Sequence, residues 1–347
     1  MKPVAFASAF VLAACAAPTD TDAPHTGTAP SAIIRGTASP ASQDSVVLVM
    51  HYDAIKVGGD TAGCTGTLLA PRLVLTARHC VADTDESVLC DGNGNAKLGG
   101  VVHGDNPASK LYVFAGQQRP DFISGLEKGS RGAELIDDGA QTLCNHDLAL
   151  ILLDNALVGG RTAPVRLDGG PTQGESVILV GWGVTDKTQQ PDVRQQRTGL
   201  SVVSVGPSDH VGPSEFVLGE SGCAGDSGGP AFDAATGAVI GILSRGGNMT
   251  GAQPGTLAAC TNAENILTST SGFGDVIRSG YDKAGQDPWL EGQPDPATLP
   301  PKPPAADKSG CAIASLPAPH SPAATWLSIA FVLATFAACA RRRRSRS

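Results

Sequence analysis

Three motifs far apart in the chain carry the side chains that acyl-transfer chemistry needs. His79 directly precedes a cysteine, Asp147 opens an apolar run (DLALILL), and Ser227 lies in the glycine-rich string CAGDSGGP. An imidazole can take the proton from a hydroxyl, and a buried carboxylate can hold that imidazole in the required tautomer. The hydroxyl can then attack a carbonyl carbon, so these residues predict a nucleophilic site if folding unites them.

Each motif by itself also has an ordinary structural interpretation. His79 could be a surface or core histidine, and Asp147 could be a turn residue at the edge of a strand. A glycine-rich turn could carry an idle Ser227. However, the glycines beside it would let backbone N–H groups approach a developing oxyanion. A string of this length is specific enough to favour the catalytic interpretation.

The elements that must position these side chains are mostly short strands. Apolar, β-branched runs bounded by glycine, proline or aspartate predict strands at 45–50, 73–76, 111–114, 148–153, 176–180, 200–205 and 238–243. Residues 271–282 are the best candidate for a short helix. So many short strands predict an all-β sandwich or barrel architecture.

Cysteine usage favours an oxidising compartment. Nine cysteines are present, and the six in the central part of the chain are an even number, as in an exported disulfide framework. A bridge between Cys64 and Cys80 would close a loop of about 15 residues, worth about 3 kcal/mol from chain entropy. It would clamp His79 where two strands meet. No Cys/His cluster has zinc spacing, so we expect neither a metal nor another cofactor.

The charge distribution argues against a nucleic-acid partner. The net charge is −8, but five of the 25 basic residues lie in the last seven positions, which leaves 20 basic against 33 acidic residues upstream. An acidic body repels phosphate backbones.

The N-terminal segment 1–17 has the layout of an export signal. One lysine precedes an apolar run that ends in the string LAAC at Cys15, which resembles the bacterial lipobox, where the cysteine is lipidated. Ordinary signal cleavage near Ala16 is the alternative. Residues 18–32 are small, polar and proline-containing, and they predict a flexible leader or propeptide.

The C-terminal part predicts a spacer followed by a membrane segment. Residues 283–310 form a proline-rich linker, and the uncharged apolar run 323–340 is just long enough to cross a bilayer core. Four arginines follow it and would stay on the cytoplasmic side. Residues 311–347 together resemble the C-terminal sorting tails of myxobacterial surface proteins. We expect the protein in the bacterial cell envelope or at the cell surface, anchored through the lipid, this segment or both, or secreted after processing.

The order His, Asp, Ser and the strings around these residues resemble the trypsin/chymotrypsin-like family of serine proteases. The similarity covers about residues 33–282 and includes GWG at 181–183 and, at 33–36, the string IIRG, which is similar to the family's mature N-terminus. It implies two Greek-key six-stranded β-barrels, with the active site in the cleft between them, and a short C-terminal helix. The substrates it implies are proteins or peptides, and we expect a monomer.

The resemblance assigns a role to each residue of the candidate site. Ser227 is the nucleophile, His79 is the general base, and Asp147 orients the imidazole. The backbone N–H groups of Gly225 and Ser227 would form the oxyanion hole.

The resemblance also bears on the remaining central cysteines. Cys223 and Cys260 match the pair that staples the family's substrate pocket, and Cys90 and Cys144 are left to pair with each other. No cysteine lies between residues 145 and 222, so one common family bridge is missing.

Four residues match positions of the family's specificity pocket, namely Ser221, Ser244, Arg245 and Asn265. Ser221 stands where trypsins carry an aspartate that binds Arg or Lys, so strict trypsin specificity is not expected. Arg245 stands where the family usually has a tryptophan, and Asn265 replaces a glycine. Ser244 matches a serine that supports the triad aspartate. We expect a preference for uncharged, small-to-medium or apolar residues.

Activation is expected to depend on Ile33 and Asp226. In the family, a freed N-terminal amine pairs with the aspartate before the catalytic serine, and this pairing forms the oxyanion hole. Ser31 and Ala32 precede Ile33, so a trypsin-like activator would not cut there. We expect a zymogen that is cut between Ala32 and Ile33 by a protease accepting small residues. The same cut would free the domain from a lipid on Cys15.

Two other functions remain open. A catalytically silent protease fold could act as a surface binding module, although such modules usually lose a triad residue. An esterase with a similar nucleophile is the second possibility, but its usual GxSxG signature does not surround Ser227.

Overall fold

The computed structural model describes residues 33–299, except 54–59, 86, 122–124, 186–190, 249 and 254. The predicted export signal with Cys15, the leader, the sorting tail and the membrane segment 323–340 therefore lie outside the described residues. Within the described part, no helix is both long and apolar enough to cross a membrane.

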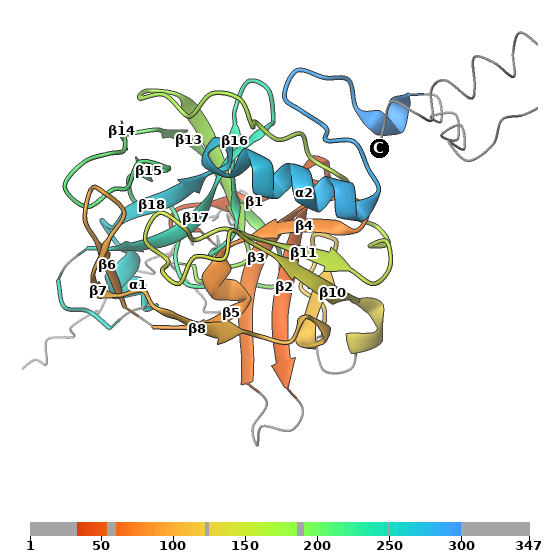
Figure 1. Ribbon diagram of the computed structural model, residues 1–347, viewed down its shortest axis with the longest axis horizontal. Coiled ribbons are helices and arrows are strands. Elements are labelled where there is room, and N and C mark those ends of the chain that lie inside the picture. Colours follow the sequence, from red (N-terminus) through yellow and green to blue (C-terminus); the bar gives the residue numbers. More distant parts are fainter. Residues whose placement is uncertain are drawn as a thin grey trace, which may run out of the picture. The chain divides into compact units, whose positions relative to one another are not determined.

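The first half of the domain is a closed antiparallel barrel of six strands, as predicted (Figure 1). Around the barrel the strands follow the order β10-β11-β4-β3-β2-β9. Their bounds are β2 (Val46–Asp53), β3 (Asp60–Ala70), β4 (Leu73–Thr76), β9 (Leu111–Phe114), β10 (Ser130–Ile136) and β11 (Ala149–Leu153).

The second half is an antiparallel sheet of eight strands in the order β1-β13-β12-β16-β17-β18-β15-β14. A second six-stranded barrel is predicted. The sheet instead has eight strands, because the short strands β1 and β14 pair with β13 and β15, and it does not close into a barrel within the described residues. The bounds are β1 (Thr37–Ala38), β12 (Ser176–Gly181), β13 (Gln195–Ser201), β14 (Ser204–Val205), β15 (Glu215–Leu218), β16 (Pro230–Asp233), β17 (Val239–Gly247) and β18 (Glu264–Ser269).

Two small two-stranded sheets and several short helices complete the fold. The paired strands are β5 (Ala82–Thr84) with β8 (Val102–Asp105), and β6 (Val88–Cys90) with β7 (Ala96–Gly99). The helices are α1 (Leu257–Cys260), α2 (Gly274–Ala284) and the 3-10 turns η1 (Ala41–Gln43), η2 (Arg78–Cys80), η3 (Ala108–Lys110), η4 (Leu126–Lys128), η5 (Thr270–Phe273) and η6 (Pro296–Thr298).

Helix α2 occupies most of the segment predicted as helical and packs on β4 and β11 (Figure 1). A Cβ at Gly280 would lie 2.5 Å from the side chain of Leu150, so only glycine allows this close approach. The Tyr281 hydroxyl donates to the carbonyl of Leu69 at 3.2 Å. With the barrel core on one face and α2 on the other, β4 and β11 are buried at every position. Their sequences are therefore apolar runs without alternation.

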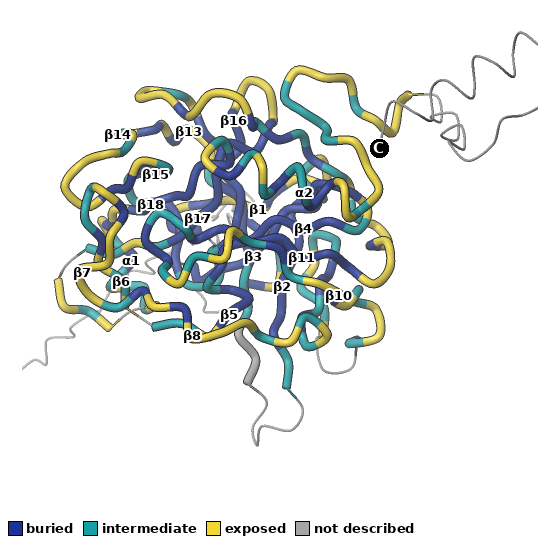
Figure 2. Tube along the Cα trace, in the orientation of Figure 1, coloured by how far each residue is buried: buried dark blue, intermediate teal, exposed yellow. Residues whose placement is uncertain are grey.

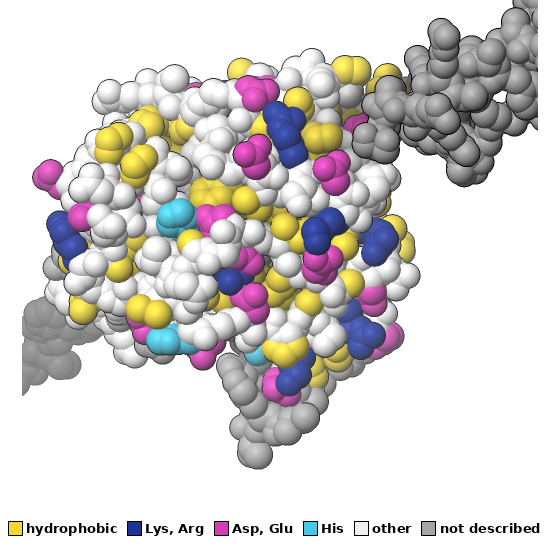
Figure 3. Space-filling model, viewed as in Figure 1, with side chains coloured by type: hydrophobic (Ala, Val, Ile, Leu, Met, Phe, Trp, Pro, Cys, Tyr) yellow, Lys and Arg dark blue, Asp and Glu magenta, His cyan; other side chains and the backbone are white. Residues whose placement is uncertain are grey.

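Buried backbone runs through both halves, while exposed segments lie around them (Figure 2). The largest apolar cluster fills the first barrel and the contact with α2, and it consists mainly of Val, Leu, Ile and Ala side chains. A second cluster fills the other sheet and includes Ile33. On the face shown in Figure 3, acidic and basic side chains lie among one another over both halves.

The described structure continues past residue 282 into the predicted linker. The N–H of Val165 donates to the carbonyl of Trp289, and the N–H of Glu291 donates back to the carbonyl of Val165. The Glu291 carboxylate also pairs with Arg166 at 2.5 Å. The first part of the proline-rich stretch is therefore packed against the domain.

Candidate active site

The fold brings His79 and Asp147 into direct contact. His79 lies in η2, directly after β4, and Asp147 directly precedes Leu148 and β11, the strand that pairs with β4. His79 Nδ1 lies 2.8 Å from Asp147 Oδ2, and the backbone N–H of His79 donates to Asp147 Oδ1 at 2.9 Å. The Ser244 hydroxyl from β17 donates to Asp147 Oδ2 at 2.6 Å. This carboxylate therefore holds the histidine by its ring and its backbone.

The electrostatics of this pair follow from burial and contact. Burial by itself raises the pKa of Asp147, but the neighbouring His79 and the hydrogen bonds from His79 and Ser244 bring that pKa below its ordinary value. Burial lowers the pKa of His79, whereas the Asp147 charge and hydrogen bond raise it, with a net increase. The pair therefore stabilises a protonated imidazole, the form that appears during acyl transfer.

Ser227 lies on a tight turn beside this pair. Gly225 has φ of +92° and Gly228 has φ of +76°, a region that L side chains rarely adopt. A Cβ at Gly228 would also come within 2.2 Å of Thr76 Oγ1. The carbonyl of Ser227 accepts the N–H of Thr65 at 2.8 Å and lies 3.6 Å from the sulfur of Cys80, the residue after His79. The glycines thus let the serine turn approach the histidine segment.

The backbone N–H groups of Gly225 and Ser227 are the predicted donors to a ligand oxygen. Within the described residues, neither group donates to a backbone carbonyl. The turn that carries them is fixed from outside, because the N–H of Val184 donates to the carbonyl of Ala224 at 2.7 Å. Free amides on a fixed turn are the requirement for binding an oxyanion.

The GWG string positions Asp226. The carboxylate accepts the N–H of Gly183 at 2.8 Å and the N–H of Cys223 at 3.0 Å. A Cβ at Gly181 would lie 2.2 Å from Asp226 Oδ1, and one at Gly183 would lie 2.5 Å from its Cγ, so both glycines make room for the acid. Burial raises the pKa of Asp226 to about 7, and these two hydrogen bonds oppose that rise only in part. The acid is therefore buried without a salt-bridge partner among the described residues.

Ile33, the residue expected to pair with Asp226 after cleavage, is fully buried in the second sheet's core. Its φ is +60°, which is a strained conformation for a β-branched residue. The N–H of Ile34 donates to the carbonyl of Ser221 at 3.2 Å. The segment expected to form the new N-terminus thus packs inside the second half, next to a residue of the predicted specificity pocket.

The four predicted pocket residues have different environments. Ser221 is fully buried, and its hydroxyl has no hydrogen-bond partner among the described residues. The Asn265 amide donates to the carbonyl of Gly219 at 3.2 Å. The Ser244 hydroxyl faces Asp147, as already described. The Arg245 guanidinium contacts the Glu215 carboxylate, with its Nη1 2.5 Å from Oε1.

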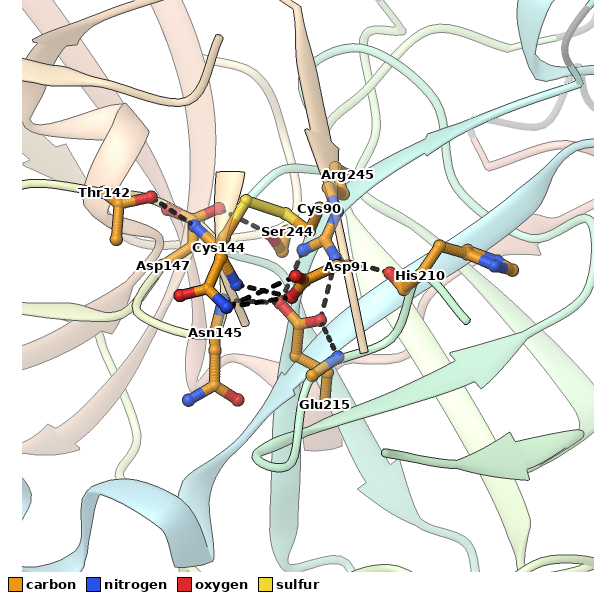
Figure 4. The surroundings of a disulfide bond; sticks show 12 residues. Cys90, Asp91, Thr142, Cys144, Asn145, Asp147, His210, Glu215, Ser244 and Arg245 are labelled. Atoms are coloured by element: carbon orange, nitrogen blue, oxygen red, sulfur yellow. Dashed lines mark hydrogen bonds and ion pairs between the residues drawn. A yellow bond between two sulfur atoms is a disulfide. The ribbon is translucent and has the colours of Figure 1, made fainter. Parts of the chain in front are cut away.

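Three disulfides join the cysteines that the sequence analysis paired, and Figure 4 shows the surroundings of one of them. Cys64–Cys80 joins β3 to the histidine turn, and Cys90–Cys144 ties β6 to the segment before Asp147. Cys223–Cys260 joins the serine loop to α1. Within the described ranges, the one cluster of possible metal ligands is Cys64, His79 and Cys80, and its sulfurs are consumed by the disulfide.

The sequence analysis missed Thr65, whose fully buried hydroxyl makes two contacts at the serine loop. It accepts the N–H of Trp182 at 3.0 Å and donates to the carbonyl of Gly225 at 2.8 Å. Its position directly after Cys64, in a strand with buried polar residues, was the available signal. The side chain therefore fixes the Gly225–Asp226 peptide, which adjoins the peptide that carries the Gly225 N–H.

Arg119 and Glu215 were also missed. The Arg119 guanidinium donates to the carbonyl of Trp182 at 2.6 Å and lies 5.5 Å from the centre of its ring. The peptide of Trp182 and Gly183 therefore lies between Arg119 and Asp226, and the arginine charge partly lowers the pKa of that acid. Glu215 is the first residue of the otherwise apolar strand β15, and no sequence pattern distinguished it.

A fold of two β-rich halves, in which a partly exposed histidine contacts a buried aspartate beside a glycine-rich serine loop, defines a trypsin-like class. A family model described as Trypsin matches residues 34–267. The match covers more than half of the chain, and the chain therefore belongs to the trypsin family of serine proteases.

Individual relatives are more distant. Phenoloxidase-activating factor 3 of Holotrichia diomphalia is 28% identical over 201 residues, which are 50% of this chain and 52% of that protein. Kallikrein-8 of Rattus norvegicus is 26% identical over 231 residues, 62% of this chain and 80% of that protein. The chain thus spans only about half the length of the first of these relatives.

A solved structure agrees on the fold. Neuropsin, described as a serine protease expressed in the limbic system of mouse brain, matches with a TM-score of 0.50 and 18% identity. The match covers 71% of this chain and 99% of the neuropsin chain. At this identity the likeness shows the fold alone.

Proposed function

We propose that this protein is an exported serine endopeptidase that hydrolyses peptide bonds through an acyl-enzyme. The observation that carries the proposal is the contact of His79 with the buried Asp147, made by both the ring and the backbone. The packing of Ser227 against Thr65 and Cys80 supports it, because this contact brings the serine turn to the histidine turn. Relatives in the trypsin family are serine endopeptidases.

In the proposed reaction, Ser227 Oγ attacks the scissile carbonyl carbon while His79 accepts the hydroxyl proton. The C–N bond then breaks, and His79 gives that proton to the leaving amine. Water next attacks the ester, His79 takes a proton from the water, and the same proton returns to Ser227 as the acid product leaves. Asp147 stays ionised throughout and stabilises the imidazolium.

The oxyanion of each tetrahedral intermediate would be bound by the N–H groups of Gly225 and Ser227. The loop carrying them is fixed before the substrate arrives, by contacts to Thr65 and Val184. Fixed donors need little reorganisation when charge develops, and losing one such donor costs roughly 100- to 1000-fold in turnover.

The proposed specificity is for uncharged, small-to-medium or apolar residues. Ser221 brings no charge to the base of the pocket, and its buried hydroxyl has no partner among the described residues. Asn265 would narrow the pocket, and the Arg245 guanidinium is neutralised by Glu215. Hydrolysis of a peptide library by the processed domain tests this, since exclusive cleavage after Arg or Lys would contradict it.

Activation and anchoring complete the proposal. A cut between Ala32 and Ile33 would create an amine that can pair with Asp226, whose burial without a cationic contact leaves it in need of one. The protein would reach the cell envelope through its export signal and be held by Cys15 lipidation, the C-terminal segment or both. N-terminal sequencing of active enzyme should begin at Ile33, whereas an active species starting at Cys15 would refute this route.

A catalytically silent binding module is the second candidate function. The observation that favours it is the environment of Arg78. This residue beside the candidate base is buried and ion-paired to Asp105 at 2.7 Å and Asp137 at 2.5 Å, which is a structural rather than catalytic environment. Labelling by a fluorophosphonate probe separates the candidates. We expect labelling and peptide hydrolysis by the processed protein, and loss of both in Ser227→Ala.

The remaining outcomes of that experiment are decisive as well. Correctly processed protein that takes no label would support the binding module. Labelling without hydrolysis of any peptide would support an esterase instead.

A further inference from the structure

We propose that Glu215 and Arg245 are positioning residues for the catalytic aspartate and that they act through Asn145. These three residues, here called the Glu215 cluster, lie beside the Cys90–Cys144 disulfide (Figure 4). The inference rests on the proposed protease function and names three further residues on which that chemistry depends.

The Glu215 carboxylate is the centre of the cluster. Its side chain is fully buried, and both of its oxygens are used. Oε1 accepts the N–H of Asn145 at 3.0 Å and Arg245 Nη1 at 2.5 Å, while Oε2 accepts the N–H of Gly212 at 2.7 Å and Arg245 Nη2 at 2.7 Å. A buried carboxylate with four donors, two of them from one bidentate guanidinium, has a single favourable position. It is therefore a fixed point inside the second half.

Asn145 transmits this fixed position to the catalytic segment. It stands two residues before Asp147 and has φ of +65°, an uncommon conformation for a residue other than glycine. Its side-chain Oδ1 accepts the N–H of Ser214 at 2.6 Å. A Cβ at Gly94 would lie 2.7 Å from the Cβ of Asn145, so only glycine at position 94 allows this close approach. Both the backbone and the side chain of Asn145 are thus fixed to the segment around Glu215.

Strand β17 reaches the catalytic segment at two adjacent residues. Side chains normally alternate between the faces of a strand, but the register of β17 against β18 shifts between Leu243 and Arg245. Such a bulge re-aims side chains. Ser244 can therefore donate to Asp147 while Arg245 reaches the Glu215 carboxylate. Because of the bulge, Ser244 contacts Asp147 while Arg245, through Glu215, holds the segment at Asn145 that leads to it.

The consequence for catalysis is geometric. If Glu215 is replaced by the neutral glutamine, the side chain no longer holds both Arg245 and the N–H of Asn145. The segment leading to Asp147 is then free to shift. A longer contact between Asp147 and His79 would weaken the effect that raises the pKa of the imidazole. The base would then be less well oriented, and a displacement of about 1 Å in such a group can cost roughly 100-fold in rate.

The test compares Glu215→Gln with Glu291→Gln in the processed enzyme. Glu291 belongs to a second Arg–Glu cluster, around Arg166. The two arginine side chains are similarly exposed, at 15% and 13%, while Glu291 is more exposed than Glu215, at 22% against 0%. We expect Glu215→Gln to lower kcat by about 10- to 100-fold with KM nearly unchanged. It should also move the acid limb of the pH–kcat profile to lower pH. Glu291→Gln should alter thermal stability only.

Two further variants keep the proposal falsifiable. Asn145→Gly suits the positive φ and keeps the backbone N–H, but it removes the acceptor for Ser214, so it should give a smaller loss of the same kind. Arg245→Lys keeps one ion pair and should lie between Glu215→Gln and the wild type. If Glu215→Gln does not fold, the acid limb of Asn145→Gly decides the question.

Unchanged kcat and an unchanged acid limb in folded Glu215→Gln would overturn the proposal, as would a loss equal to that of Glu291→Gln. Such a result would leave the protease function intact, because the wild-type enzyme would still hydrolyse peptides. Failure of the proposed function itself is visible separately, as absence of fluorophosphonate labelling in the wild type.

Discussion

Asp147 and Asp226 are both buried carboxylates, one in contact with His79 and the other directly before Ser227, yet their surroundings differ in one respect. Asp147 contacts a histidine and a serine hydroxyl, and its pKa lies below the ordinary value. Asp226 accepts two backbone N–H groups but contacts no cation among the described residues, and burial raises its pKa to about 7. The difference shows that the uncut chain already provides partners for Asp147, the proposed triad aspartate, whereas Asp226, the proposed activation partner of Ile33, lacks a contacting positive charge among the described residues.

The largest expected effect comes from breaking the Asp147 side of this comparison. Asp147→Asn keeps the shape but favours the wrong tautomer of His79, so kcat should fall on the order of 10,000-fold. The neutral amide would also lower the pKa of His79, because the anion that raises it is gone while the burial that lowers it remains. Single-turnover kinetics across a pH series would measure both effects. A loss below about 10-fold would show that Asp147 does not orient the base.

The raised pKa of Asp226 predicts that the stability of the uncut chain depends on pH. The pKa of Asp226 is about 7 in the folded chain, against an ordinary value of 3.8 for an exposed aspartate. The folded state therefore binds the proton more tightly than the unfolded state does. This difference adds to the free energy of unfolding, fully below the unfolded pKa, and the added stability is lost as the pH rises through 7. The difference corresponds to roughly 4 kcal/mol at most.

Chemical denaturation of uncut Ser227→Ala protein between pH 4 and about 8 would measure this loss. Adding Asp226→Asn should remove the part due to this acid. Chain cut after Ala32 should also lack it, because the new amine would stabilise the carboxylate. Identical pH profiles for cut and uncut chain would contradict the expected pairing of Ile33 with Asp226.

The smallest expected effect concerns Thr65, whose side chain contacts the serine loop. Thr65→Val removes the acceptor for Trp182 and the donor for Gly225, and leaving such buried groups unpaired costs about 1–3 kcal/mol. We expect kcat to fall about 10-fold while KM changes little.

Thr67 is the matched control for this change. It is equally buried on the same strand, but its hydroxyl has no partner among the described residues. Thr67→Val should therefore leave kcat unchanged and cost little stability. Equal losses in both variants would mean that the side-chain contacts of Thr65 do not position the oxyanion amides.

Much of the fold was accessible because local pattern and tertiary environment agree. Strands β4 and β9 were predicted at their observed bounds. Both are largely buried, and burial favours the apolar, β-branched residues by which a strand is recognised in a sequence. The run 200–205 splits instead between β13, which ends at Ser201, and β14. The open eight-stranded second sheet was not predicted, because two-residue edge strands carry too little pattern to recognise.

The sequence by itself determined which residue types stand beside His79 and Ser227 and which cysteines are available to pair. Such information is local, because glycines and cysteines reveal a turn or a bridge wherever they occur. Only the tertiary structure decided that Glu215, Arg245 and Thr65 meet the catalytic segments. Their contacts join residues between 30 and 160 positions apart, and a single polar residue in a buried strand does not reveal its partner.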